Sequence, residues 1–295
     1  LGDVYKRQAL AKFVEGDGSR VFEQSGVTET ESDPLAVHVN GHRIACHRLI
    51  LMTHVPLMGN AGVLSAGLFQ TKIAAYTSYA VSAKTTKGRI PLGIYSDTDD
   101  PYRYLRVVPH DDHDIAILGG EDHKTGQADD ADDRYRKLES ALLKLLPDGI
   151  LGHRWCGQVM ETPDGLPYMG ETAPGQFAAT GFAGNGMTWG TLAGMMACDY
   201  VMQRPNPWAE LLSTGRVKVR GAALDYLKEN VDYPYYMVRG YLERAEGNSF
   251  ADLVEGEGKI LKIDGKKAAC FRDADGHVHA VSAVCTHMGC IVQFN

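Results

Sequence analysis

The sequence predicts a mixed fold of the α/β and α+β classes that ends in a small all-β region. Residues 68–119 are rich in Tyr, Thr, Val and Ile and alternate in polarity, as antiparallel strands do. Residues 176–202 change from a short apolar strand, through a glycine-rich turn, into an apolar helix. Residues 253–295 have the pattern of short strands separated by Asp-Gly turns.

The elements expected before the β-rich stretch are short. Residues 4–16 favour a helix that closes at glycine. Strands are expected on both sides of a tight turn at Asn40-Gly41. The apolar run LILM at 49–52 has the continuity of a strand that is buried on both faces.

One strong helix pattern follows the β-rich stretch. Residues 129–146 gather acidic side chains at the N-terminal end and leucines on one face, which predicts an amphipathic helix. Residues 153–171 are expected to be irregular around the turn Pro163-Asp164-Gly165. Residues 205–250 are expected to form a polar connector with a short helical piece near 221–230.

Composition limits the classes of function. The chain has 295 residues, 44% hydrophobic and 23% charged, which is typical of a globular protein with more than one domain. A net charge of −7 argues against nucleic acid or an anionic membrane surface as the main partner. No apolar run approaches the ~18 residues of a transmembrane helix. Six scattered cysteines do not make a secreted disulfide scaffold, so a cytoplasmic location is expected.

The glycine-rich turn is the first candidate binding site, and its glycines are Gly181, Gly184, Gly186, Gly190 and Gly194. Glycine lets the backbone approach a ligand closely, and a helix start presents free N–H groups and partial positive charge. Such a site suits a phosphate or the N1/C2=O edge of a flavin. On spacing alone, a packed glycine-rich helix without a ligand is an equal alternative. The chain contains no GxGxxG motif with a downstream acidic residue.

Several segments carry a family resemblance. RWCGQVMETPDGLPYMGE and FAATGFAGNGMTWGTLAGMMACDYV resemble the C-terminal flavin-contacting part of the glycine/D-amino-acid oxidase (DAO) superfamily of FAD-dependent oxidoreductases, and VFEQSGVTET and HRLILMTHVP resemble its mid-chain strands. The resemblance implies an FAD cofactor with the backbone of Val27 near the adenine. It also implies that the isoalloxazine or ribityl chain lies against Gly184, Asn185, Gly186, Met187 and Thr188. Because the family's N-terminal GxGxxG unit is absent, the expected fold is a partial FAD-binding (Rossmann-like) domain with an antiparallel-sheet substrate domain.

The sequence departs from this family at one position that concerns the substrate. Relatives that oxidise amino acids usually hold the substrate carboxylate with an Arg in a G-x-R-P stretch, and the corresponding stretch here is Gly157-Gln158-Val159-Met160. Val159 cannot pair with a carboxylate. The expected substrate is therefore of an amine, amino-acid or related type, with a simple amino acid disfavoured. Arg154, Tyr102 and Arg103 are candidates for lining the substrate cavity, although a solvated or structural role is the favoured alternative for each.

The segment VCTHMGCIVQFN at the end of the chain contains Cys285, His287 and Cys290. A Rieske centre binds one iron through two Cys and the other through two His, so two loops each supply one Cys and one His. GKILKIDGKKAACFRDADGHVHAVSAVCTHMGC resembles the opening strands and first ligand loop of an all-β Rieske [2Fe–2S] domain. The resemblance implies that Cys285 and His287 form the first half of the site and that Cys290 is a disulfide candidate. The second ligand pair and the partner of Cys290 are expected beyond Asn295. A zinc site and a chance Cys-x-His are the alternatives.

These patterns predict five segments: 1–62 partial FAD-binding domain, 63–127 mostly antiparallel substrate domain, 128–205 rest of the substrate domain with the C-terminal FAD-contacting segment, 206–250 connector, and 251–295 N-terminal half of the Rieske domain. The chain thus looks truncated at both ends, and LGDVYKRQ at 1–8 fits poorly with the residues after it.

The predicted function is that of an FAD-dependent oxidoreductase that acts on a small-molecule substrate. A [2Fe–2S] cluster would exchange electrons with the flavin and with a redox partner or electron acceptor. No side chain is a convincing general base, so the catalytic residues are unknown. The alternatives are an electron-transfer and docking module with a degenerate flavin domain, and an inactive fragment.

Overall fold

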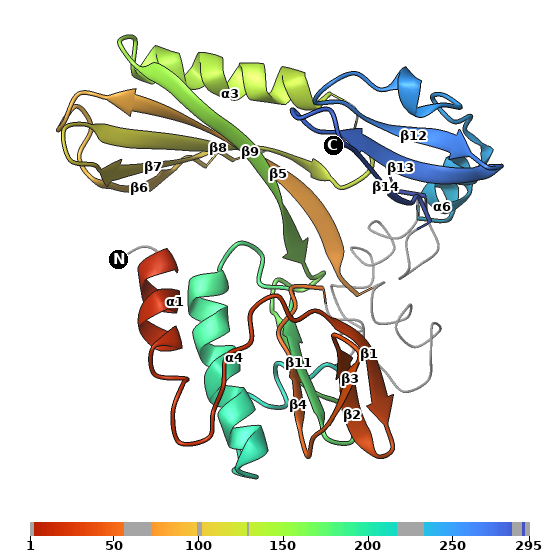
Figure 1. Cartoon of the computed structure of the whole chain (residues 1–295). Coiled ribbons are helices and arrows are strands. Elements are labelled where there is room, and N and C mark those ends of the chain that lie inside the picture. The colour runs from red at the N-terminus through yellow and green to blue at the C-terminus, as the bar shows by residue number, and fades with distance from the viewer. Residues whose placement is uncertain are drawn as a thin grey trace. The chain divides into compact units, whose positions relative to one another are not determined.

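The computed structural model describes residues 3–55, 72–98, 102–128, 130–216, 233–284 and 291–292. The chain divides into two compact units, each built from two separate stretches of sequence. The first unit consists of Leu1–Ala66 and Gly165–Lys218, and the second of Gly67–Asp164 and Val219–Asn295. Figure 1 labels the elements of both units.

The first unit begins with helix α1 (Asp3–Ala11) and a three-stranded antiparallel sheet. This sheet has the order β1 (Val27–Ser32), β2 (Leu35–Val39), β3 (His42–Ala45). The β2–β3 connection turns at Asn40 and Gly41, whose φ angles are +49° and +79°. Two consecutive left-handed residues are what a tight hairpin turn needs, so the predicted Asn-Gly turn is confirmed.

A second sheet of this unit combines residues that are far apart in the sequence. Its order is β10 (Tyr168–Ala173), β11 (Gln176–Thr180), β4 (Leu49–Leu51). Strand β11 is antiparallel to β10 and parallel to β4, and all five of its residues are buried. Strand β4 is only half-buried, and it is an edge strand of the sheet among the described residues. The expectation that β4 is buried on both faces is therefore wrong.

Helix α4 (Gly186–Val201) follows β11, as the switch from strand to helix predicts. Its buried residues Ala193, Met196 and Ala197 pack into one core with strand residues such as Phe177 and Met169. This packing fixes the start of α4 near the end of β11.

The second unit contains a five-stranded antiparallel sheet. Its order is β6 (Gly93–Ser96), β7 (Tyr104–Pro109), β8 (Asp114–Lys124), β5 (Ala74–Thr85), β9 (Ile150–Glu161). This confirms the predicted antiparallel stretch. Strands β9 and β10 show that the irregular structure expected over 153–171 is wrong on both sides of the turn, whereas the predicted turn at Pro163-Asp164-Gly165 is confirmed. Most side chains of β9 are exposed, so burial does not alternate along it, and pairing with β5 defines it as a strand.

Helix α3 (Ala131–Leu145) covers one face of this sheet (Figure 1), as the leucine pattern predicts. Leu138 and Leu142 are fully buried against Tyr79, Val81 and Ala83 of β5. Side chains alternate between the two faces of a strand. The even-numbered residues of central β5, including Tyr76 and Ser78, therefore lie on the face opposite α3.

The C-terminal part of the described chain contains helix α6 (Tyr233–Leu242), the short helix η1 (Phe250–Asp252) and a three-stranded antiparallel sheet. The sheet has the order β12 (Gly258–Ile263), β13 (Lys266–Arg272), β14 (Val278–Ser282), which confirms short strands here. The helical piece expected near 221–230 lies outside the described residues. Among the described helices, none is both long and apolar enough to cross a membrane.

Candidate functional site

The only parallel pair among the described strands marks the candidate binding site. Strands β4 and β11 run side by side, and Met52, His54, Gly181 and Phe182 follow their carboxyl ends. These residues line a cavity of about 170 Å³ together with Ala179 and Thr180 at the end of β11. Ligands of α/β sheets bind outside the carboxyl ends of parallel strands. The cavity therefore lies where this architecture places a ligand.

The predicted glycine turn starts at this cavity. Gly181, Ala183 and Gly184 have φ angles of +76°, +45° and +75°, so the chain reverses through left-handed backbone before α4 begins. The Asn185 backbone N–H donates to the Phe182 carbonyl at 2.8 Å, and its side-chain amide donates to the Ala183 carbonyl at 3.2 Å. A Cβ atom added at Gly184 would meet no atom within 4 Å. Open space beside glycine backbone fits a flat group that lies against the turn.

The first turn of α4 supplies the electrostatics. Gly186 and Met187 are the first two helical residues, and N–H groups at this position have no partner within a helix. The Asn185 carbonyl accepts from the N–H groups of Thr188 and Trp189 at 3.1 and 3.0 Å. No acidic residue lies in the first turn, so nothing there neutralises the positive end of the helix dipole. Negative charge on a ligand is favoured at this point.

The structure brings Gly181, Gly184, Asn185, Gly186, Met187 and Thr188 together at one strand-to-helix junction. Val27 is instead the first residue of β1, in a separate sheet of the same unit, and its side chain is 56% exposed. Trp189 packs partly buried against the α4 core.

Cys285, His287 and Cys290 lie outside the described residues. The residues on either side of them are placed: Val284 and Ile291 form an antiparallel bridge, and the Val292 N–H donates to the Ala283 carbonyl at 2.8 Å. Leu253, Leu261 and Cys270 form the buried core of the β12–β14 sheet. The two ends of the 285–290 segment are thus paired next to a packed sheet, which suits a ligand-bearing loop. The other four cysteines are free thiols.

The residues considered for a substrate cavity divide between the two faces of the five-stranded sheet. Arg103 forms an ion pair with Glu121, and Arg154 lies 3.2 Å from Asp132 of α3 and over the ring of Tyr135. Both arginines therefore have structural partners on the α3 side. The ring of Tyr102 lies 6.5 Å from that of Tyr104, whose alternation places it on the opposite face.

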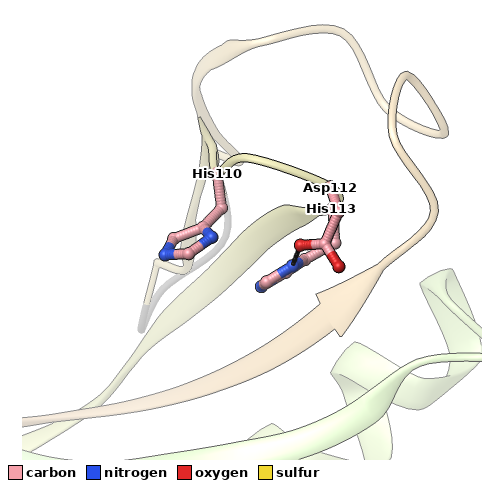
Figure 2. A group of neighbouring side chains, drawn as sticks. All are labelled: His110, Asp112 and His113. Carbon is pink, nitrogen blue, oxygen red and sulfur yellow. Dashed lines mark hydrogen bonds and ion pairs between the residues drawn. The ribbon is translucent and has the colours of Figure 1, made fainter.

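Figure 2 shows a second group of metal-ligand type in the turn between β7 and β8. The ligand atoms of His110, Asp112 and His113 lie within 4.8 Å of one another. His113 Nδ1 is 2.6 Å from the Asp112 carboxylate, and the hydrogen bond with His113 lowers the pKa of Asp112. The His110 N–H also donates to the His113 carbonyl at 2.9 Å, so the group is explained as a hydrogen-bonded hairpin turn.

Comparison with known families gives two matches. Residues 7–200 match the DAO family, described as FAD dependent oxidoreductase, and residues 248–295 match the Rieske [2Fe-2S] domain. A protein of Bacillus subtilis (strain 168), "Putative Rieske 2Fe-2S iron-sulfur protein YhfW", is 27% identical over 293 residues. The match covers 98% of this chain and 56% of the relative, so the chain spans about half the length of that protein.

Solved structures share the fold of about two-thirds of the chain. Glycine oxidase from Geobacillus kaustophilus has a TM-score of 0.52 at 18% identity, over 68% of this chain and 54% of its own. L-proline dehydrogenase from P. horikoshii has a TM-score of 0.52 at 19% identity, over 67% of this chain and 55% of its own. At these identities the likeness shows the fold alone.

Proposed function

Because the chain belongs to the DAO family of FAD-dependent oxidoreductases and carries a Rieske [2Fe–2S] domain, we propose that it oxidises an amine-type substrate and exchanges electrons between flavin and cluster. The flavin accepts a hydride equivalent when bound, and the cluster carries single electrons. The protein's own task is to bind and orient these groups and the substrate.

The observation that carries this proposal is the open glycine turn at the carboxyl ends of β4 and β11. Gly184 leaves space beside its backbone, and the N–H groups of Gly186 and Met187 start a helix without an acidic residue in its first turn. This arrangement favours an electron-rich edge of a flat ring over the turn. The side chains of Asn185 and Thr188 are the further hydrogen-bonding groups there. Val27 would lie near the adenine.

The cluster part of the proposal rests on the chemistry of the ligands and on their setting. Cys285 and His287 would bind different irons, and Cys290 would tie this loop to a second one by a disulfide. The bridge between Val284 and Ile291 supports the proposal, because it holds the ends of the segment together. The second Cys–His pair would come from a separate loop.

The test substitutes glycines of equal backbone strain. Gly184 and Gly88 both have φ +75° and open space around an added Cβ, but Gly88 lies in the turn before β6, in the other unit. The chain is mixed with FAD, passed through gel filtration, and the bound flavin is measured by absorbance. Gly184→Val should reduce bound flavin about 10-fold or more, because its side chain fills the space against the turn.

The Gly88→Val variant should bind flavin as the parent chain does, since it has the same backbone strain as Gly184→Val but lies outside the proposed flavin site. Equal flavin binding by all three proteins would contradict the assignment of the glycine turn. Binding of iron without any flavin would favour the alternative of an electron-transfer module with a degenerate flavin domain.

A further inference from the structure

A strained bulge interrupts strand β8. Thr77 of β5 pairs with His123, whereas Tyr79 pairs with Gly120, so β8 has one more residue than β5 between these two pairs. Gly120 has φ +140°, and Glu121 has φ +57°, a left-handed conformation that a residue with a Cβ rarely adopts. Bulges redirect side chains and are common next to active sites.

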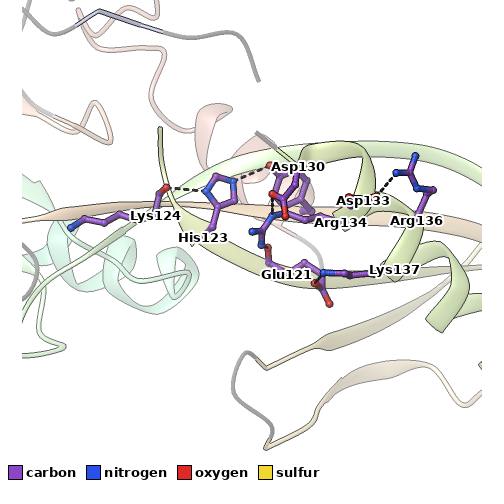
Figure 3. Close-up of polar contacts among 9 residues, drawn as sticks. Glu121, His123, Lys124, Asp130, Asp133, Arg134, Arg136 and Lys137 are labelled. Carbon is purple, nitrogen blue, oxygen red and sulfur yellow. Dashed lines mark hydrogen bonds and ion pairs between the residues drawn. The ribbon is translucent and has the colours of Figure 1, made fainter. Parts of the chain in front are cut away.

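The α3 side of the bulge is fixed by ion pairs, which Figure 3 shows. The Glu121 side chain is 9% exposed and pairs with Arg103 and, at 3.7 Å, with Lys137 of α3. Arg134 of α3 donates to the Glu121 carbonyl at 2.7 Å. The left-handed residue is therefore held by both its side chain and its backbone.

The next residue, Asp122, lies on the opposite face of the sheet. The hydroxyl of Ser78, which is on that face of β5, lies beside both Asp122 and Tyr104. Tyr104 pairs with Gly119, and a Cβ at Gly119 would lie 2.1 Å from the Tyr104 Cζ atom. The tyrosine ring thus occupies the space that a side chain at Gly119 would need.

Small residues leave room beside this carboxylate. Ser78 pairs with Gly157 of β9, where an added Cβ would meet no atom within 4 Å. Val159, two residues further along the same face, pairs with Tyr76 and carries no charge. The space is therefore bounded by a carboxylate, tyrosine rings and apolar or small side chains, with Lys124 beside Tyr76 further along the same face.

One carboxylate oxygen of Asp122 takes no part in these contacts. Its Oδ1 atom is buried and has no hydrogen-bond partner among the residues that the structure describes. Burial raises the pKa of Asp122, and Ser78 offsets this in part. The neighbouring side chains of Arg134 and His123 make their contacts on the α3 side: Arg134 pairs with Asp130, and His123 bonds the Tyr79 hydroxyl at 3.0 Å. A buried carboxylate oxygen without a donor requires an explanation.

We infer that Asp122, together with Tyr102 and Tyr104, binds the protonated amino group of the substrate on the face opposite α3. A carboxylate pairs with an ammonium group, and tyrosine rings attract a cation through their faces. The site would repel a substrate carboxylate, so the substrate class is a cationic amine and not an amino acid. This inference rests on the proposed oxidoreductase function, whose substrate it defines.

Three probes with one phenyl ring and different charge test the inference: benzylamine, phenylacetate and phenylalanine. Binding to the full chain is measured by isothermal titration calorimetry at neutral pH. Benzylamine should bind at least 10-fold more tightly than phenylalanine, and phenylacetate should not bind. Asp122→Asn should weaken benzylamine binding at least 10-fold, while Asp111→Asn, in the exposed β7–β8 turn, should leave it unchanged.

Gly157→Leu provides a second variant, because it fills the open space and keeps the carboxylate. It should abolish benzylamine binding without lowering the midpoint of thermal unfolding. The inference is overturned if the chain does not bind benzylamine. That result is expected if the ammonium group of Lys124, two residues along the same face, pairs with the Asp122 carboxylate. It is equally overturned if Asp122→Asn binds benzylamine as tightly as the parent chain.

The two proposals fail separately in these measurements. A chain that binds FAD but not benzylamine contradicts the amine site alone. A chain that binds benzylamine in an Asp122-dependent way but not FAD contradicts the flavin assignment and leaves the amine site standing.

Discussion

The two faces of the five-stranded sheet have opposite properties, although adjacent residues of the same strands form them. The α3 face is filled with leucines and closed by ion pairs, and Glu121 there has partners for its side chain and its carbonyl. The other face carries Ser78 and Gly157, with open space around a Cβ added at Gly157, and the buried Oδ1 of Asp122 has no described hydrogen-bond partner. One face stabilises the sheet, and we assign binding to the other.

The largest effect is expected in the α3 core. Leu142 is fully buried, and Leu142→Ala removes packing and leaves a cavity, which should lower the free energy of unfolding by about 2–5 kcal/mol in urea titration. Leu145 lies on the same helix and is 53% exposed, so Leu145→Ala should change it by less than about 1 kcal/mol. Equal effects would mean that α3 does not stabilise the sheet through this face.

A smaller effect is expected at the ion pairs of Glu121 on the α3 side of the bulge. Glu121→Gln leaves the cations of Arg103 and Lys137 without their buried partner and should cost about 1–3 kcal/mol of unfolding free energy. Asp133→Asn breaks an ion pair with Arg136 in which both side chains are more than half exposed, and should cost less than about 1 kcal/mol.

Glu121→Gln also tests whether the two faces are coupled. If the ion pairs of Glu121 hold Asp122 in position, the variant should weaken benzylamine binding several-fold, although Glu121 lies on the other face. Unchanged binding would show that the bulge keeps its shape without the ion pairs.

The smallest effect is a difference in pH dependence between two aspartates. The hydrogen bond with Arg134 lowers the pKa of Asp130, so its stabilisation is present above the unfolded pKa and is lost as pH falls through the lowered folded value. Burial raises the pKa of Asp122, so its ionisation reduces stability as pH rises from the unfolded pKa through the raised folded value.

At neutral pH the two substitutions should therefore change stability in opposite directions. Asp130→Asn should lower the free energy of unfolding, and Asp122→Asn should raise it. Urea titrations between about pH 3.5 and 7 measure both, and each difference should shrink toward the acid end. A loss of stability from Asp122→Asn at neutral pH would show that the carboxylate has a partner within the protein.

Local patterns predicted much of the fold. The Asn40-Gly41 turn, the leucine face of α3 and the change from strand to helix at the glycine turn each depend on neighbours in sequence, and all three are confirmed. Strand β9 was missed because exposed side chains hide its periodicity. The half-buried state of β4 was missed because a strand's position in a sheet depends on distant partners.

The candidate sites show the same division. The sequence by itself determined the glycine turn and the Cys-x-His pair. The conformational freedom of glycine and the metal-binding chemistry of Cys and His are properties of the residues themselves. Only the tertiary structure sorted Arg103 onto the α3 face and Tyr102 beside Tyr104. It alone singled out Asp122, because a single extra residue in β8 decides which face that carboxylate occupies, and strand pairing, not local sequence, reveals such a bulge.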